Sequence, residues 1–131
     1  MNKLLIFPIT VLLSLFHGCT NGQYSKTSLS PNAFSEKINQ MPDAAIIDVR
    51  TPQEFSDGHL IHATNMDWNG DRFEAQVSTL DKSKPVFVYC YSGGRSAAAA
   101  KKMRANGFTE VYELAGGFSK WRDAKLPVAN D

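Results

Sequence analysis

A cysteine stands between an apolar run and a glycine-rich turn in the stretch VFVYCYSGGRS, residues 86–96. Two adjacent glycines, Gly93 and Gly94, allow the backbone to curl so that successive N–H groups point inward. A helix that begins near Gly94 adds the positive end of its dipole, and Arg95 adds a permanent charge with a planar fork of donors. Each of these features favours the thiolate of Cys90 over its thiol. The stretch therefore predicts an anion-reactive site with Cys90 as a sulfur nucleophile.

The position of Cys90 in the chain supports this interpretation. Cys90 is the last residue of an apolar run typical of a buried strand, and ligands of an open parallel sheet bind outside the carboxyl ends of its strands. No acidic residue occurs between Asp81 and Glu110, so nothing close in sequence opposes a negative charge on the sulfur. The alternative is a buried structural cysteine in a glycine-rich turn, which would not account for the arginine and the helix start.

The elements that must position this cysteine alternate along the chain. Ser30 and Pro31 indicate a helix start, with a serine cap and proline at the first helical position. Thr51 and Glu54 form a capping box that begins a second, short helix. We expect helices at residues 31–41, 52–57, 71–80, 94–106 and 118–124. We expect strands at residues 44–49, 59–66, 86–90 and 110–114.

Short apolar strands that alternate with helices predict an α/β fold, in which a central parallel sheet has helices on both faces. The length of 131 residues, with 43% hydrophobic and 21% charged residues, suits one globular domain and a leading segment. We place this domain at residues 29–128. The chain has no internal repeats.

Residues 1–18 have the pattern of an export signal. Lys3 supplies a positive start, and the apolar run from Leu4 to Phe16 follows it. That run is shorter than the about 20 apolar residues that span a bilayer. It matches the apolar core of a secretory signal peptide, which is removed from the mature protein.

The signal ends in LFHGC, where Gly18 and Cys19 are similar to a bacterial lipobox. Phe16 and His17 depart from that pattern. We expect cleavage before Cys19, a lipid on its sulfur, and a polar tether over residues 19–28. The alternative is a plain secreted protein that is cut nearby.

The charge balance excludes two classes of partner. The chain has 14 Lys and Arg residues and 13 Asp and Glu residues, and the numbers become equal once the signal and its Lys3 are removed. A neutral balance argues against binding to nucleic acid and against an electrostatic hold on anionic membranes. We expect the protein to contact the membrane only through its lipid anchor, on the periplasmic or cell-surface side.

Export also sets the chemistry of the two cysteines, because compartments outside the cytoplasm are oxidising. A disulfide between Cys19 and Cys90 is one possibility. If Cys19 carries lipid, this pairing is excluded and Cys90 is left as the only thiol.

Four segments stand in order along the domain: IIDVRTPQEFSDGHL, VYCYSGGRSAAAA, GFTEVYELAGGFSKW and LPV. Together they resemble the single-domain rhodanese family of sulfurtransferases, and the most specific element is the loop Cys-x-x-Gly-x-Arg formed by Cys90, Gly93 and Arg95. The family usually has glycine at the position of His62 and at the position of Lys125, before Leu-Pro. These two departures lie outside the loop.

The resemblance implies that Cys90 takes a sulfane sulfur from a small anionic donor such as thiosulfate. The resulting persulfide then passes to a thiophilic acceptor, a thiol or cyanide. The resemblance also implies a substrate-binding cradle around the persulfide, with Ser96 at its far edge. The backbone of five residues forms this cradle: Tyr91, Ser92, Gly93, Gly94 and Arg95. No metal and no organic cofactor are implied, and we expect a monomer.

Three other functions compete with this one. Cysteine phosphatases and arsenate reductases use a similar loop, but they place the arginine one position further from the cysteine, which makes room for a tetrahedral anion. The spacing from Cys90 to Arg95 favours a single terminal sulfur. A non-enzymatic binding module generally lacks the cysteine, which this chain keeps. A persulfide carrier uses the same loop, so the sequence does not separate it from an enzyme.

Several other polar and aromatic residues have structural explanations. Asp48 and Arg50 end a strand at the edge of the predicted site, and we expect them to form a structural ion pair. His59 follows a helix-ending glycine, and we expect it to make a local hydrogen bond, because transfer onto a preformed thiolate needs no base. Trp68 and Tyr91 are candidates for a pocket wall.

Overall fold

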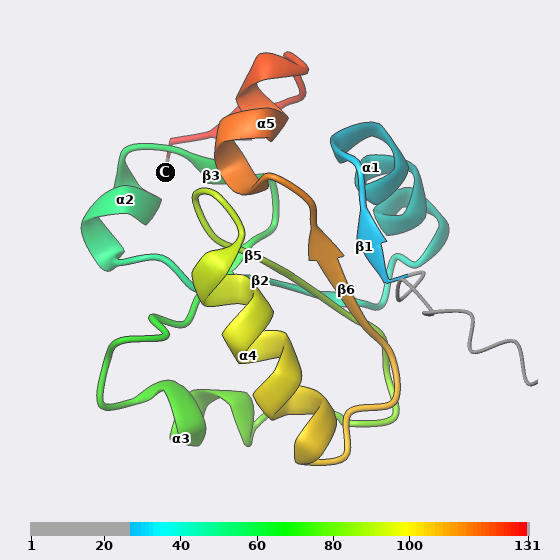
Figure 1. Cartoon of the computed structure of the whole chain (residues 1–131), viewed down its shortest axis with the longest axis vertical. Coiled ribbons are helices and arrows are strands. Elements are labelled where there is room, and N and C mark those ends of the chain that lie inside the picture. The colour runs from blue at the N-terminus through cyan, green and yellow to red at the C-terminus, as the bar shows by residue number, and fades with distance from the viewer. Residues whose placement is uncertain (1–26, 131) are drawn as a thin grey trace, which may run out of the picture.

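The computed structural model describes residues 27–130. They form one α/β domain around a sheet of five strands in the order β1-β6-β5-β2-β4 (Figure 1). Every neighbouring pair in this sheet is parallel. The strands are β1 (Ser28–Leu29), β2 (Ala45–Asp48), β4 (Thr64–Asn65), β5 (Val86–Tyr89) and β6 (Val111–Leu114). The predicted α/β class with a central parallel sheet is therefore confirmed.

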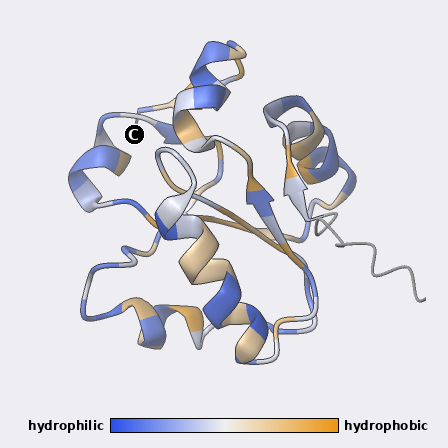
Figure 2. Cartoon of the chain, viewed as in Figure 1, coloured by the Kyte–Doolittle hydropathy of each residue, from blue (hydrophilic) through white to orange (hydrophobic). Residues whose placement is uncertain are grey.

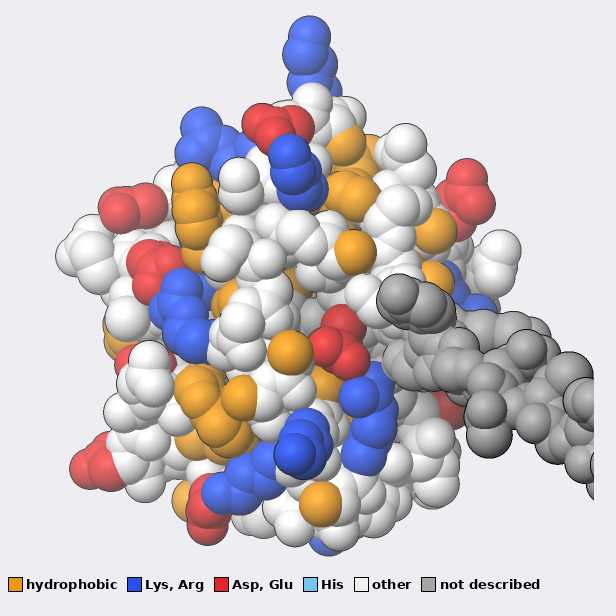
Figure 3. Space-filling model, in the orientation of Figure 1, with side chains coloured by type: hydrophobic (Ala, Val, Ile, Leu, Met, Phe, Trp, Pro, Cys, Tyr) orange, Lys and Arg blue, Asp and Glu red, His pale blue; other side chains and the backbone are white. Residues whose placement is uncertain are grey.

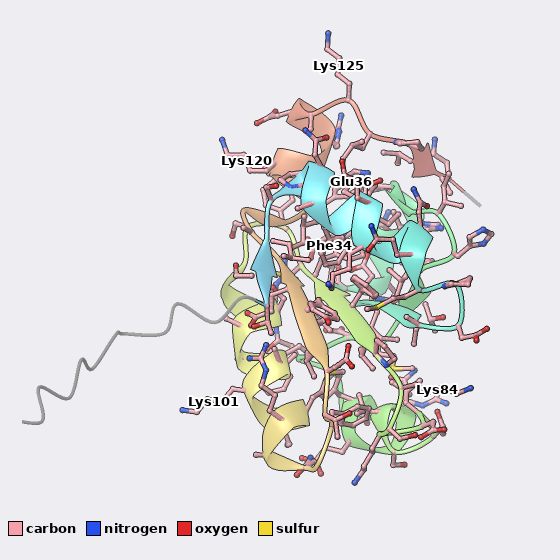
Figure 4. The ribbon with its side chains drawn as sticks, turned by 90° about the vertical axis from the view of Figure 1, so that its right-hand side faces the viewer. Phe34, Glu36, Lys84, Lys101, Lys120 and Lys125 are labelled. Atoms are coloured by element: carbon pink, nitrogen blue, oxygen red, sulfur yellow. The ribbon has the colours of Figure 1, made fainter. Side chains whose placement is uncertain are left out.

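Helices cover both faces of this sheet, as the alternation of elements predicts. The helices of the domain are α1 (Pro31–Gln40), α2 (Pro52–Ser56), α3 (Phe73–Val77), α4 (Gly94–Ala105) and α5 (Gly117–Asp123). One core cluster packs α1 and α5 against the sheet, and the other packs α3 and α4. Figure 2 shows the hydrophobic colour along the central strands, and in Figure 4 Phe34 points from α1 toward the sheet.

The alternation of side chains along β5 decides which face carries the cysteine. Phe87 and Tyr89 lie in the core cluster with α1 and α5, whereas Val86, Val88 and Cys90 lie in the cluster with α3 and α4. This pattern follows from the two-residue period of a strand. Cys90 therefore faces the helix α4 that the glycine-rich turn begins.

The helix starts that the sequence predicts are present. The side chain of Ser30 accepts a hydrogen bond from the N–H of Ala33 over 3.3 Å, and Pro31 takes the first helical position of α1. At α2 the N–H of Glu54 donates to Thr51 Oγ1 over 3.2 Å, while the Glu54 carboxylate accepts from the N–H of Thr51 over 3.4 Å. This reciprocal capping box holds Glu54 at the base of α2.

The expected strand over residues 59–66 is two strands in different sheets. β3 (His59–Leu60) pairs antiparallel with β7 (Val128–Ala129), a strand that the sequence did not indicate. β4 joins the main sheet beside β2. Between β3 and β4 the backbone turns at His62, whose φ of 66° is left-handed. That turn prevents one continuous strand.

His62 and Lys125 are the two non-glycine residues with positive φ among residues 27–130, at 66° and 56°. They are also the two positions at which the resemblance described above implies glycine. The chain therefore keeps both turns while placing a side chain in each, at a cost of about 1 kcal/mol per position.

The third helix is shorter than the expected 71–80. The Ser78 hydroxyl donates to the carbonyl of Ala75, and the Thr79 hydroxyl donates to the carbonyl of Gln76, both over 2.6 Å. These bonds occupy carbonyls that a longer helix would use for its backbone, which favours an early end.

Strand β1 lies at the N-terminal end of the described residues. Ser28 pairs with Glu113 in β6, and the carbonyl of Thr27 accepts a hydrogen bond from the N–H of Glu113 over 2.7 Å. The predicted signal peptide, Cys19 and tether residues 20–26 lie outside the described residues. No helix within residues 27–130 is long and apolar enough to cross a membrane.

Candidate functional site

Cys90 lies directly after β5, at the carboxyl edge of the sheet. Its side chain is 1% exposed and belongs to the core cluster that contains α4. Residues 91–93 form the loop to Gly94, where α4 begins. In Figure 1 this loop runs between α2 and α5, above the first turn of α4. The sulfur is thus covered by its own loop and by the start of the following helix.

Helix α5 fixes the direction of the loop's peptide groups. The N–H of Phe118 donates to the carbonyl of Cys90 over 2.8 Å, and the N–H of Ser119 donates to the carbonyl of Tyr91 over 3.0 Å. In a trans peptide the N–H points away from the carbonyl of the same unit. Because both carbonyls face α5, the N–H groups of Tyr91 and Ser92 face the opposite side.

Two glycines make this arrangement possible. Gly117 has φ of 63°, and a Cβ there would lie 2.4 Å from the carbonyl oxygen of Tyr91, so only glycine allows α5 to approach the loop. Gly93 has φ of 117°, in the range that favours glycine. Its N–H donates to Cys90 Sγ over 3.1 Å. This N–H therefore points inward to the sulfur, as the two glycines of the loop predicted.

The hydroxyl of Ser96 completes the surroundings of the sulfur. The Cys90 thiol donates to Ser96 Oγ over 3.4 Å, and the Ser96 hydroxyl donates to the carbonyl of Gly93 over 3.2 Å. When the sulfur is ionised, the same hydroxyl can turn and donate to it. Ser96 is 1% exposed, so this hydroxyl does not exchange its partner for water.

These donors decide the ionisation of the thiol. Burial alone raises the pKa of Cys90, but hydrogen bonds from the Ser96 hydroxyl and from the N–H groups of Ser96, Gly93 and Ser92 outweigh it. The pKa of Cys90 is therefore lowered from its ordinary value. A lowered pKa increases the thiolate fraction near neutral pH, as a nucleophilic role requires.

Arg95 has a partner that the sequence did not reveal. Its two terminal nitrogens donate to the two carboxylate oxygens of Glu54, Nη1 to Oε1 over 2.8 Å and Nη2 to Oε2 over 3.0 Å. Arg95 is the main reason that the pKa of Glu54 is lowered to about 2. The same carboxylate raises the pKa of Arg95. Both groups are therefore charged throughout the physiological range.

Asp48 and Arg50 form the predicted structural ion pair, at 2.6 Å and almost completely buried. Asp48 also accepts from the N–H of Arg50 over 2.9 Å and from the hydroxyl of Tyr89 over 2.6 Å. Arg50 donates a further bond to the carbonyl of Gly58. The pair fixes the end of β2 beside the loop.

The predictions for His59, Trp68 and Tyr91 have different outcomes. The ring of His59 stacks on Phe55 at 3.7 Å, and its Nδ1–H donates to the carbonyl of Phe55 over 2.8 Å, which confirms a local hydrogen bond. Trp68 packs edge-on against Phe73, with ring centroids 5.0 Å apart, and is partly buried against the core cluster that contains α4.

Tyr91 does line a pocket beside the loop. Its side chain is 50% exposed, the largest exposure among the large hydrophobic residues of the described part of the chain. The pocket has a volume of about 320 Å³. The other residues that line it are Arg50, Glu54, Asp57, Phe118 and Arg122. Tyr91 and Glu54 thus join this pocket to the loop that surrounds the sulfur.

The groups around Cys90 can stabilise a negatively charged second sulfur atom that is bonded to Cys90 Sγ. Inward N–H groups and a hydroxyl surround a sulfur whose pKa is lowered, and they can stabilise negative charge that is moved to a second sulfur bonded to it. Within residues 27–130, no group of three or more His, Cys, Asp and Glu side chains could hold a metal ion.

Two functional positions escaped the sequence analysis. Glu54 was visible only as part of a capping box, because its bond to Arg95 joins residues 41 apart in the chain. Gly117 was visible only within the segment GFTEVYELAGGFSKW, and its contact with the Tyr91 carbonyl depends on how α5 docks. The second glycine of the Gly116-Gly117 pair was the available signal for a close approach.

Known proteins place this arrangement in a family. The model of the rhodanese-like domain matches residues 30–124. The uncharacterized protein YqhL of Bacillus subtilis is 42% identical over 78 residues, which are 60% of this chain and 60% of that protein. The thiosulfate sulfurtransferase GlpE of Ectopseudomonas mendocina is 37% identical over 79 residues, 60% of this chain and 71% of that protein.

Solved structures agree with these relatives. A rhodanese-related protein from Thermoplasma volcanium aligns with a TM-score of 0.70 and 25% identity, over 79% of this chain and 98% of that one. The polysulfide-sulfur transferase homodimer from Wolinella succinogenes aligns with a TM-score of 0.67 and 32% identity, over 79% of this chain and 77% of that one.

Proposed function

The chain belongs to the rhodanese-like domain family, and on that premise we propose that it is a sulfurtransferase that carries a sulfane sulfur as a persulfide on Cys90. One observation supports this most directly. The N–H of Gly93 is aimed at Cys90 Sγ from 3.1 Å, in a loop whose first two carbonyls are held on the other side by α5. Such a loop stabilises a charged sulfur before any substrate arrives.

The first half-reaction loads the cysteine. The Cys90 thiolate attacks the outer sulfur of thiosulfate and forms a new S–S bond. The bond between the two sulfur atoms of thiosulfate breaks, and sulfite leaves with its electron pair. The product is a persulfide whose terminal sulfur carries one negative charge. The N–H groups of Ser92 and Gly93 and the hydroxyl of Ser96 are the donors that stabilise this charge.

The second half-reaction unloads it. An acceptor nucleophile, cyanide or a thiolate, attacks the terminal sulfur, and the bond to Cys90 Sγ breaks. The electron pair of that bond returns to Sγ, and the thiolate is restored. Neither half-reaction needs an external oxidant, a reductant or a general base.

A mass measurement tests the proposal. After incubation with thiosulfate, the protein should gain the mass of one sulfur atom, and the peptide that contains Cys90 should carry it. Cyanide should then remove this mass and release thiocyanate. Cys90→Ser should abolish both events, while Cys19→Ala should change neither. Added mass and thiocyanate formation in Cys90→Ser would refute the proposal.

The same preparation separates the competing functions. Repeated thiocyanate turnovers per protein indicate an enzyme, whereas one sulfur delivered per protein indicates a carrier. Hydrolysis of p-nitrophenyl phosphate that depends on Cys90 would indicate a phosphatase instead. The short loop, with Arg95 already engaged by Glu54, favours the sulfur reactions.

We further propose that the domain acts outside the cytoplasm, anchored through lipid on Cys19, as a monomer. The LFHGC sequence at the end of the signal supports the lipid anchor. The protein should sediment with membranes and be released by detergent, and Cys19→Ala should accumulate as uncleaved precursor. A mature protein free in the soluble extracytoplasmic fraction would contradict the anchor.

A further inference from the structure

The cation of the loop is already neutralised in this structure. Arg95 makes a bidentate bond to Glu54, which uses both carboxylate oxygens. Since the pKa of Glu54 is lowered to about 2, this carboxylate stays charged at any pH at which the protein works. Figure 3 shows acidic and basic side chains in contact between α2 and the start of α4. An arriving anion therefore meets an ion pair at this position.

The other charges around the loop are balanced too. Arg50 is paired with Asp48, and the pocket beside Tyr91 presents Asp57 as well as Arg122. The attraction of the loop for an anion thus comes mainly from backbone N–H groups and the start of α4. Backbone dipoles suit one localised negative charge, such as that of a persulfide. They give little compensation to a second charge on the same substrate.

We propose that Glu54 is the charge-selectivity residue of this site: it disfavours dianionic sulfur donors and directs the loop toward monoanionic ones, such as thiosulfonates and organic persulfides. Glu54 is a positioning residue here, because it holds Arg95 and contributes its charge without contacting the reacting sulfur. This inference rests on the proposed sulfurtransferase function and adds the class of donor.

Two donors of nearly equal shape isolate the effect of charge. Methanethiosulfonate differs from thiosulfate by a methyl group in place of one charged oxygen, so it is a monoanion. The Cys90 thiolate attacks its outer sulfur, the S–S bond of the donor breaks, and methanesulfinate leaves with the electron pair. Both donors form the same persulfide on the protein. They therefore differ mainly in the charge of the donor and of its leaving group.

The variant Glu54→Gln removes the charge and little else. Glutamine serves as well as glutamate at the third helical position of a capping box, so the start of α2 is kept. An amide oxygen still accepts a hydrogen bond from Arg95. The matched control is Glu74→Gln on α3, an exposed carboxylate that is paired with Lys102. Thermal unfolding checks that both variants are folded.

Glu54→Gln should raise kcat/KM for thiosulfate, relative to that for methanethiosulfonate, by about 3- to 10-fold, because one unit charge near the site is removed. The change should appear in KM rather than kcat. It should shrink as salt is added, because the ion pair is partly exposed. Any effect of the substitution on the pKa of Cys90 acts on both donors and cancels in the ratio. Glu74→Gln should leave the ratio unchanged.

An unchanged ratio in Glu54→Gln, or equal losses with both donors, would overturn the inference and assign Glu54 a purely structural role. Alkylation provides a readout that needs no sulfur transfer. Glu54→Gln should speed the reaction of Cys90 with anionic iodoacetate more than with neutral iodoacetamide, measured on the Cys90 peptide. If neither donor forms a persulfide, the proposed function fails, while the alkylation ratio still decides whether Glu54 sets charge selectivity.

Discussion

Two neighbouring strands end side by side in this domain, and they use their polar groups in opposite ways. At the end of β2, the carboxylate of Asp48 accepts from Arg50 and Tyr89, so side chains satisfy one another in a buried cluster. At the end of β5, a buried thiol is surrounded by N–H groups and one hydroxyl. The first cluster contains a full positive and a full negative charge, and the second contains a single titratable group.

The contrast shows why only one of the two strand ends is chemically available. Neutralising one charge in the β2 cluster leaves its partner buried and unpaired, which strongly lowers the stability of the folded protein. The sulfur of Cys90 can gain or lose a proton, or bond a second sulfur, while the same donors remain in place. Substitutions at the two ends should therefore separate stability from reactivity.

The largest effect on stability is expected for Asp48→Asn, which leaves the buried Arg50 without its counter-charge. We expect a loss of about 3–5 kcal/mol in the free energy of unfolding, measured with urea. Adding Arg50→Met should recover part of it, because the unpaired charge is then gone. Asp57→Asn, at the exposed C-cap of α2, should change stability by less than about 0.5 kcal/mol. An Asp48→Asn protein of unchanged stability would mean that the cluster is not structural.

A smaller loss is expected for Gly117→Ala, which acts on the loop through its support. The new Cβ would lie 2.4 Å from the carbonyl oxygen of Tyr91, on a backbone with φ of 63°. We expect a loss of roughly 2–4 kcal/mol in stability and slower alkylation of Cys90, because the loop must move. Gly107→Ala has a similar backbone penalty with only a distant neighbour, and should cost about 1 kcal/mol without changing alkylation.

The smallest change in stability, and a specific change in reactivity, is expected for Ser96→Ala. Without the hydroxyl, the pKa of Cys90 should rise, and the alkylation rate near pH 7 should fall by about 2- to 10-fold. Stability should change by about 1 kcal/mol or less. The rate–pH curve should shift to higher pH and reach the same plateau. An unshifted curve would exclude Ser96 as a donor to the thiolate.

The same ionisation predicts how pH acts on stability. The pKa of Cys90 is lower in the folded protein, so folding favours the thiolate. Its contribution to stability is complete above the ordinary thiol pKa of about 8.5, and is lost as the pH falls through the lowered value. Ser96→Ala should reduce this gain at alkaline pH. Urea unfolding of both proteins across that range measures the difference.

The sequence predicted those parts of the site that depend on neighbouring residues. Cys90 at a strand end, the left-handed Gly93 and the start of α4 follow one another in the chain, so local rules suffice. The bond from Arg95 to Glu54 depends on α2 docking beside α4, and no local pattern encodes it. For this reason the sequence analysis treated Arg95 as a free cation, whereas the structure pairs it.

The fold shows the same division. The apolar runs of β2 and β5 predicted buried strands of a parallel sheet, because such strands are continuously hydrophobic. β3 and β7 have two residues each, which is too short to show a hydrophobic periodicity. They pair with each other although they lie far apart in the sequence. The expected single strand over residues 59–66 was wrong because the backbone at His62 takes a conformation that favours glycine.

The bonds from α5 to the carbonyls of Cys90 and Tyr91 have a consequence for the protection of the thiol during folding. Phe118 follows Cys90 by 28 residues, so the loop around the thiol has no fixed orientation until α5 has docked onto it. Until α5 docks, the peptide groups around the sulfur can rotate, and an oxidant meets an unshielded cysteine. The folding chain is therefore most vulnerable to thiol damage until α5 has docked.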